Sequence, residues 1–461
     1  MKLALTRIAE FVGGSANVEH DVSAEGYSID TRTLQPGDLF FAVKGERLDG
    51  HDYVEAALQK GAAAAVVRED QVGRFAVGSK LIAVSDPLVA LQTLATAVRK
   101  LWGKSLVGIT GSVGKTTTKE AIAHVLASRY RVLKSEGNFN NHFGLPLMLL
   151  KLQPEHEVAV IEMGMSHTGE ITALAKIAQP EVGVVTSVAP VHLEFFDSIA
   201  DIARAKYELI ASLSSQGTAV LNADDQYVSQ FGRDFKGKVV QYGMKPSADV
   251  RAEHVEARGS EGSTFDLVVG GARERVMLPL VGAHNVSNAL AAAAVGLELG
   301  VPAHEVAGAL RTLAPADKRG QVVQVGNITV VNDCYNSNPT ALNAMIDALL
   351  AMPGKRHIVV AGEMLELGPT GEALHRDSGS RAAAKKVDVL LGVRGLAQAM
   401  VDGAKSGGVQ SEFVKSPEEA GEWLARETRE GDVVLLKASR GVKLEKALER
   451  WKALREGGAH K

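Results

Sequence analysis

Cysteine is nearly absent from this 461-residue chain, which contains only Cys334. A single cysteine excludes an intrachain disulfide framework and a cysteine-based zinc site, and it fits a reducing compartment. Long hydrophobic runs are absent too, since no stretch approaches the roughly 20 apolar residues of a membrane-spanning helix. The first residues also lack the apolar core of a secretory signal. We therefore expect a cytoplasmic protein without membrane insertion.

An excess of charge of one sign is also missing, because 51 Lys and Arg residues face 54 Asp and Glu residues. The net charge of −3 argues against nucleic acid or an anionic membrane as a partner. What the chain does contain is 46% hydrophobic residues, which is typical of globular proteins and enough for several cores. The length suggests about three domains of ordinary size.

A glycine loop between a strand pattern and a helix pattern is the most informative segment. Residues 105–109 fit a buried strand, and residues 119–126 carry apolar side chains at helical spacing. Strand, glycine loop and helix in this order form a phosphate cradle of backbone N–H groups, a lysine and a Mg²⁺-binding hydroxyl. The pattern is Gly111-x-x-Gly114-Lys115-Thr116, with Ile109 where the full motif has its first glycine. An ordinary glycine turn is the alternative, and the strand and helix around the loop favour the cradle.

The loop predicts a bound nucleoside triphosphate. No Asn-Lys-x-Asp segment for reading guanine is present, which favours ATP. The residues expected to surround its phosphates are Gly111, Ser112, Val113, Gly114, Lys115, Thr116 and Thr117.

Strand and helix patterns alternate along most of the chain, which predicts an α/β fold of parallel sheets with helices on both faces. We expect three domains: a small α/β domain at 1–102, a central P-loop ATPase domain at 103–313, and a Rossmann-like α/β domain at 314–461. Residues 248–280 break the pattern with short alternating runs and glycines, as in antiparallel hairpins. Residues 313–320 look like a linker.

Five further residues could carry chemistry. Asn140 lies in an asparagine-rich loop, which an ordinary turn would also explain. Glu162 ends a buried strand, where a parallel sheet presents its ligand crevice, so it is a candidate Mg²⁺ ligand or else a salt-bridged carboxylate. His192 follows another strand and could be functional or structural. The pattern around Lys206 predicts a lysine on the surface of a helix. Cys334 is interpreted as a small buried side chain.

Together these segments resemble the Mur ligases, the ATP-dependent amide-forming enzymes of peptidoglycan precursor synthesis. The motifs that carry the resemblance lie at 110–120, at 138–146, at Asn336-Ser337-Asn338-Pro339 and at 362–368. The resemblance covers essentially the whole chain. It implies ligation of D-alanyl-D-alanine to UDP-N-acetylmuramoyl-tripeptide through an acyl phosphate, with ATP and Mg²⁺, by a monomer whose domains close around the intermediate.

The resemblance also implies roles for individual residues. Lys115 would hold the β- and γ-phosphates, and Lys206 would be carbamylated, which reverses its reading as a surface residue. Metal binding falls to Thr116, Glu162, His192 and Lys206, and Lys115, Lys206 and His192 form the catalytic set. Asn140, Asn285, Arg319 and Asp333 complete the nucleotide site. The UDP-sugar end would be held by Ser28, Asp30, Arg32, Gly45, Asp49 and His51.

Some positions depart from the family pattern, and several alternatives stay open. Glu363 replaces an aspartate, Asn332 replaces the first aspartate of a pair, and Arg319-Gly320 reverses a frequent Gly-Arg. Another Mur-type ligase that adds diaminopimelate, lysine or glutamate is the nearest alternative, although the Asp-Asn-Pro-Arg segment of the diaminopimelate-adding type is absent. A P-loop ATPase or small-molecule kinase, and a nucleotide-binding scaffold without turnover, are the others.

Overall fold

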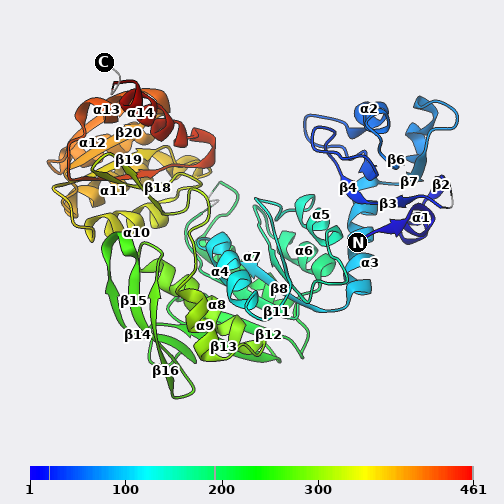
Figure 1. The fold of residues 1–461 in the computed structure, drawn as a ribbon, viewed down its shortest axis with the longest axis horizontal. Coiled ribbons are helices and arrows are strands. Elements are labelled where there is room, and N and C mark those ends of the chain that lie inside the picture. The colour runs from blue at the N-terminus through cyan, green and yellow to red at the C-terminus, as the bar shows by residue number, and fades with distance from the viewer. Residues whose placement is uncertain (20, 192–193, 459–461) are drawn as a thin grey trace.

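The computed structural model describes residues 1–19, 21–191 and 194–458, and it arranges them around three successive sheets (Figure 1). The first sheet has the order β2-β7-β6-β5-β4, in which only the β2 pairing is antiparallel. Its strands are β2 (Ser15–Asn17), β4 (Gly26–Ser28), β5 (Asp38–Phe41), β6 (Ala64–Arg68) and β7 (Leu81–Val84). A separate pair joins β1 (Leu3–Ala4) to β3 (Ser23–Ala24), and the helices are α1 (Leu5–Val12), α2 (Val54–Gln59) and α3 (Pro87–Trp102).

The first sheet, the β1–β3 pair and the helices α1 to α3 make up what we call the first unit. Helix α3 connects this unit to the central sheet, and residues next to each end of the helix determine where it begins and ends. Asp86 caps the N-terminus by accepting hydrogen bonds from the N–H groups of Leu88 and Val89, and Pro87 occupies the first turn. Gly103 ends the helix at φ 62°, a left-handed conformation that glycine adopts readily. Helix α3 lies against α1 and also against α5 and α6.

The central sheet has nine strands in the order β16-β15-β14-β13-β12-β11-β8-β10-β9. The strands from β9 to β14 are parallel, and β14, β15 and β16 form an antiparallel meander. In chain order the strands are β8 (Ser105–Thr110), β9 (Val132–Lys134), β10 (Val158–Glu162), β11 (Val182–Val185), β12 (Thr218–Asn222), β13 (Lys238–Gly243), β14 (Val250–Ala257), β15 (Ser263–Val269) and β16 (Ala272–Leu278).

Helices cover both faces of the central sheet, as its apolar strands require. Helices α4 (Lys115–Leu126), α8 (His284–Glu298) and α9 (Ala303–Leu310) share one hydrophobic core. Helices α5 (Gly144–Leu150), α6 (Glu170–Ala178) and α7 (Ile199–Ala211) share another, to which the first unit also contributes Leu5, Phe41 and Leu94. One continuous core therefore joins the first unit to the central sheet.

The third sheet has the order β17-β18-β22-β19-β20-β21, and only the β17–β18 pairing is antiparallel. Its strands are β17 (Gln321–Val325), β18 (Ile328–Asp333), β19 (Arg356–Gly362), β20 (Val389–Val393), β21 (Gln410–Val414) and β22 (Asp432–Lys437). Its helices are α10 (Pro339–Leu350), α11 (Gly371–Ala384), α12 (Ala397–Ser406), α13 (Pro417–Glu427) and α14 (Glu445–Gly458). Helices α10 to α12 form a core with one face, and α13 and α14 with the other.

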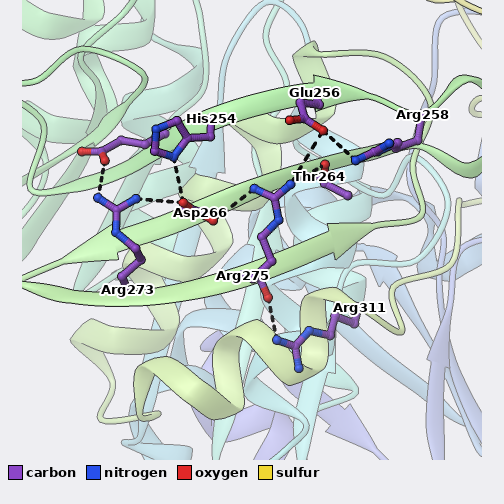
Figure 2. Close-up of polar contacts among 9 residues, drawn as sticks. His254, Glu256, Arg258, Thr264, Asp266, Arg273, Arg275 and Arg311 are labelled. Atoms are coloured by element: carbon purple, nitrogen blue, oxygen red, sulfur yellow. Dashed lines mark hydrogen bonds and ion pairs between the residues drawn. The ribbon is translucent and has the colours of Figure 1, made fainter.

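The solvent face of the β14–β16 meander carries an ion-pair network centred on Asp266 (Figure 2). Its carboxylate contacts His254 Nδ1 at 2.9 Å and accepts hydrogen bonds from Arg273 at 2.8 Å and Arg275 at 3.1 Å. His254 has φ 49° at the register shift of β14. The opposite face buries Phe265, so the strands alternate between a charged face and the core.

Two sequence expectations are settled by the fold. The hairpins expected at 248–280 are the β14–β16 meander. Cys334 is fully buried, with Sγ 3.5 Å from the Leu436 carbonyl oxygen, and burial raises the pKa of its thiol. Across the described ranges, no helix is long and apolar enough to cross a bilayer.

Candidate active site

The glycine loop follows β8, which lies between β11 and β10 in the central sheet, and it leads into helix α4. Gly111 has φ 148°, and a Cβ there would lie 1.9 Å from Thr186 Oγ1, so no other residue fits. Gly114 has φ 88° and is the N-cap of α4. The loop backbone and the positive end of α4 therefore face the same space, as a phosphate cradle requires. Lys115 Nζ donates a hydrogen bond to the Gly111 carbonyl oxygen at 2.7 Å.

The segment after β11 forms hydrogen bonds with this loop. Thr186 Oγ1 donates to the Val113 carbonyl oxygen at 2.6 Å, and Ser187 Oγ accepts from the Val113 N–H at 3.2 Å. Ser112 is held twice, by the Ser187 carbonyl oxygen at 2.8 Å and the Ala189 carbonyl oxygen at 3.1 Å. Sequence reasoning did not single out Thr186 or Ser187, although they end the strand predicted at 182–187.

Glu162 joins the loop to the other predicted residues. The carboxylate is 4% exposed at the end of β10, next to β8. Thr116 Oγ1 donates to its Oε2 at 2.9 Å, and Asn140 Nδ2 donates to its Oε1 at 2.9 Å. Arg319 from the linker reaches the same hydroxyl, with a nitrogen 3.0 Å from Thr116 Oγ1. The structure thus brings Thr116, Asn140, Glu162 and Arg319 together.

A divalent cation fits this group of oxygens. Glu162 is buried, and it accepts hydrogen bonds from neutral donors while forming no ion pair with any described residue. A buried carboxylate without an ion pair attracts a cation, and carboxylate and hydroxyl oxygens are the ligands that Mg²⁺ prefers. His192, the other expected ligand, lies outside the described residues. Within the described ranges, no cluster of three His, Cys, Asp or Glu side chains could hold a metal alone.

Two lysines face this centre in unusual settings. Lys206 on α7 is 2% exposed, and its pKa is lowered well below the ordinary value by burial and by the positive charge of Lys115. Among the described residues, no hydrogen-bond partner is found for Lys206 Nζ. Desolvation also lowers the pKa of Lys115, with the Glu162 carboxylate opposing and Arg319 adding to the shift. Lys206 is therefore a buried amine whose surroundings disfavour its charged form.

The N-terminus of α8 connects to the glycine loop through a row of amides. Asn285 Nδ2 donates to the Val281 carbonyl oxygen at 2.8 Å, and Asn288 Nδ2 donates to Asn285 Oδ1 at 2.9 Å. Asn288 Oδ1 accepts from Thr118 Oγ1 at 3.1 Å in α4. Asn288 was not predicted as a site residue, although its spacing of three from Asn285 on an alanine-rich helix was a usable signal.

In the third sheet, Asp333 lies opposite Lys437 at the ends of two neighbouring parallel strands. Lys437 Nζ donates to the Asp333 carboxylate and to the Asn336 carbonyl oxygen. Ser439 Oγ accepts from the Leu365 N–H at 2.9 Å and donates to the Ser337 carbonyl oxygen at 3.3 Å. The two C-terminal motifs, at 336–339 and 362–368, therefore meet at Lys437 and Ser439.

The residues predicted for the UDP-sugar form two groups in the first unit, away from the glycine loop (Figure 1). Asp30 binds the Arg32 guanidinium with both oxygens, which lowers the pKa of Asp30, and Ser28 caps the same turn. His51 Nδ1 lies 2.6 Å from Asp49 Oδ1, and His51 Nε2 accepts from the Arg68 N–H at 3.0 Å. Gly45 lies in the exposed loop that ends at Asp49.

The whole chain matches proteins of one family. Three family models match it: "Mur ligase family, catalytic domain" at residues 23–99, "Mur ligase middle domain" at 109–296 and "Mur ligase, glutamate ligase domain" at 318–440. The UDP-N-acetylmuramoyl-tripeptide--D-alanyl-D-alanine ligase of Bacillus subtilis (strain 168) is 35% identical, over 97% of this chain and 98% of that protein. The chain belongs to the Mur ligase family.

Further Mur ligases agree in sequence and fold. The corresponding ligase of Escherichia coli (strain K12) is 32% identical over 99% of both chains. A crystal structure of MurF from Acinetobacter baumannii has a TM-score of 0.90 at 28% identity and covers 98% of this chain and 99% of that one. MurF from Thermotoga maritima, solved in complex with ADP, has a TM-score of 0.81 at 30% identity, with 93% and 97% covered.

Proposed function

We propose that this Mur ligase joins D-alanyl-D-alanine to UDP-N-acetylmuramoyl-tripeptide with conversion of ATP to ADP and phosphate, in peptidoglycan precursor synthesis. The observation that carries the substrate assignment is the similarity to ligases of that name over nearly the full length of both chains. The observation that supports ATP is the glycine loop facing Glu162, together with the MurF relative solved with ADP.

The chemistry requires a poor acyl donor to be activated. An oxygen of the peptide carboxylate attacks the γ-phosphorus of ATP, the bond to the β–γ bridging oxygen breaks, and ADP leaves. The dipeptide amine then attacks the acyl carbon of the resulting acyl phosphate, phosphate leaves, and a proton is lost from nitrogen. Both first-step reactants are anions, so their repulsion must be offset by cationic groups. We assign that role to Lys115, which directly precedes Thr116 in the chain, and to Arg319, which donates a hydrogen bond to the Thr116 hydroxyl.

We assign Mg²⁺ to Thr116, Glu162, His192 and a carbamylated Lys206. When bound, the cation would neutralise charge on the phosphates. The loop N–H groups from Gly111 to Thr117 would bind phosphate oxygens, with Asn140 orienting Glu162.

The remaining contacts of the proposal are those with the adenine, the ribose and the UDP-sugar. We assign the adenine side to Asn285 and the ribose to Asp333, and the UDP-sugar end to Ser28, Asp30, Arg32, Gly45, Asp49 and His51. Each of the three segments 1–102, 103–313 and 314–461 thus holds one part of the reaction. Because all these groups come from one chain and the reaction consumes ATP, we propose a monomer that works in the cytoplasm.

The test is release of phosphate from Mg·ATP with UDP-N-acetylmuramoyl-tripeptide, with and without D-alanyl-D-alanine. Release that needs both co-substrates, together with the mass of the pentapeptide product, is the expected result. A requirement for another amino acid in place of the dipeptide would correct the substrate within the same family. Release that needs neither acceptor would replace the ligase proposal by an uncoupled ATPase.

A further inference from the structure

The linker that carries Arg319 is held in an unusual backbone conformation. Lys318 has φ 56° and Gly320 has φ 70°, so left-handed residues stand on both sides of Arg319. Two hydrogen bonds hold Lys318: its N–H donates to Gln321 Oε1 at 3.1 Å, and its carbonyl oxygen accepts from the Tyr335 N–H at 3.2 Å. Left-handed conformations are costly for residues other than glycine, and they persist where the surroundings enforce them. Tyr335 is part of those surroundings.

Tyr335 also holds the side chain of Arg319. The guanidinium carbon lies 4.0 Å from the centre of the Tyr335 ring, within the range of a cation–π contact. The same guanidinium donates to Thr116 Oγ1 at 3.0 Å, across the junction between the third unit and the central sheet. Among the described residues no carboxylate is ion-paired with Arg319. The aromatic ring therefore acts together with the Thr116 hydroxyl to restrain this long and flexible side chain.

Contact with the Tyr335 ring leaves the Arg319 guanidinium able to bind phosphate. The N–H donors of a guanidinium lie in its plane, whereas an aromatic ring contacts the face of the cation. A carboxylate partner would occupy those donors, but the Tyr335 ring leaves them available for anionic oxygens. Thr116 directly follows Lys115 in the glycine loop, so the donors of Arg319 lie where the proposed function puts the phosphates of ATP.

We propose that Tyr335 is a positioning residue, which acts through Arg319 by aiming its guanidinium at the nucleotide phosphates. This inference rests on the proposed function, because it needs a nucleotide at the glycine loop. Tyr335 contributes its ring and not its hydroxyl, for which no hydrogen bond is found within the described part of the chain. Nucleotide affinity should therefore depend on an aromatic ring at position 335, and only while Arg319 is present.

The test compares ADP affinity, measured by calorimetry on the full-length protein, for Tyr335→Leu, Tyr335→Phe, Arg319→Ala and the double variant Tyr335→Leu/Arg319→Ala. We expect Tyr335→Leu to weaken ADP binding by roughly tenfold, as for loss of one partly desolvated cation–π contact. Tyr335→Phe should stay within about twofold of wild type, because the ring remains. The double variant should bind ADP no more weakly than Arg319→Ala alone. Phe11→Leu is the matched control, since Phe11 makes the same kind of contact with Arg7 in the first unit.

Additive losses in the double variant would overturn the inference, because Tyr335 would then act on the nucleotide by itself. A loss in Tyr335→Phe equal to that in Tyr335→Leu would overturn it too, by assigning the effect to the hydroxyl. If Tyr335→Leu does not fold, Tyr335→Met takes its place. Wild-type protein that binds ADP with the expected dependence on Tyr335 but forms no pentapeptide would contradict the proposed function and leave the inference standing.

Discussion

Lys206 shows how burial alters the chemistry available to one side chain. A protonated amine does not react with carbon dioxide, whereas a neutral amine forms a carbamate. Burial and the neighbouring charge of Lys115 both lower the pKa of Lys206, which disfavours its protonated form. A carbamate would replace a buried amine by an anionic oxygen ligand beside Lys115. The setting of Lys206 therefore supports the carbamylation that the family resemblance implied.

At this position we predict that Lys206→Ala abolishes most amide formation and that added acetate or formate restores part of it. A short carboxylate can enter the space left by the lysine stem and supply the missing oxygen ligand. Pentapeptide formation measured against acetate concentration is the readout, and Lys176→Ala, on the neighbouring helix α6, serves as the control without rescue. Absence of any rescue, with the variant still folded, would count against the carbamate.

Lys115 permits a second prediction at the same scale. Lys115→Ala should lower kcat/KM for ATP by about 100-fold or more, because a preorganised charge aimed at the transferring phosphoryl group is lost. Steady-state phosphate release measures this effect. Turnover that stays within about tenfold of wild type would remove Lys115 from the phosphate role.

The site residues that sequence could predict share one property, which is their place at the end of a strand or in a motif with glycine. Glu162 was predicted from the end of its strand, and it does contact Thr116. Thr186 and Tyr335 were not predicted, because their roles depend on contacts to residues far along the chain. Thr186 packs beneath a loop that lies 73 residues away, and no local pattern reports such a contact.

Among the elements, fully buried strands were predictable and partly exposed edge strands were not. The buried strand that was predicted to end at Glu162 matches β10, since four consecutive apolar residues before the strand end are distinctive. Strands β9, β17 and β21 lie at or near sheet edges and are partly exposed, so their sequences lack a clear apolar run. Their pairing is decided by neighbouring strands, which a local pattern does not contain.

The β14–β16 meander allows a prediction about pH and salt. Hydrogen bonds from His254, Arg275 and Arg273 lower the pKa of Asp266 in the folded state. A lowered folded-state pKa stabilises the protein above the unfolded value of about 3.9, and this stabilisation is lost only as the pH falls toward the folded value. Asp266→Asn should therefore weaken the meander equally at about pH 5 and pH 8, and less at high salt.

Hydrogen exchange of the β15 amides, compared between variant and wild type at each pH, measures this effect locally. Glu274→Gln is the matched control, because Glu274 lies in β16 and has no ion pair among the described residues. A difference that changes between about pH 5 and pH 8 would contradict the assignment to Asp266 and point to His254.

The hydrophobic cores divide the whole molecule differently from the three domains that the sequence pattern predicted. The first unit and one face of the central sheet share a core, whereas the third sheet has two further cores, to which the central segment contributes Val281. The boundary placed after residue 102 stays a prediction, since α3 packs on both of the units that it separates. We infer that residues before the linker unfold together and that the C-terminal sheet unfolds independently.

Arg99 of α3 should carry much of the coupling between the first unit and the central sheet. It is 4% exposed, and it donates to the Ala178 carbonyl oxygen at 2.7 Å, the Gln179 carbonyl oxygen at 3.0 Å and Glu181 at 2.6 Å. The two carbonyl groups belong to the last residue of α6 and to its C-cap, where backbone carbonyls have no hydrogen-bond partner within the helix. Arg99→Ala leaves them unsatisfied and should cost about 2 to 3 kcal/mol of unfolding free energy.

The three tryptophans separate this loss from any effect on the third sheet. Trp102 lies in α3 and donates to the His156 carbonyl oxygen, while Trp423 and Trp451 lie in the C-terminal core. In urea, Arg99→Ala should lower the midpoint of the unfolding transition that Trp102 fluorescence reports in a Trp423→Phe/Trp451→Phe background. In a Trp102→Phe background, where Trp423 and Trp451 report on the C-terminal core, the midpoint should stay unchanged. Lys100→Ala, one residue away and exposed, should shift neither; a joint shift of both transitions in Arg99→Ala would mean that the C-terminal sheet belongs to the same cooperative unit.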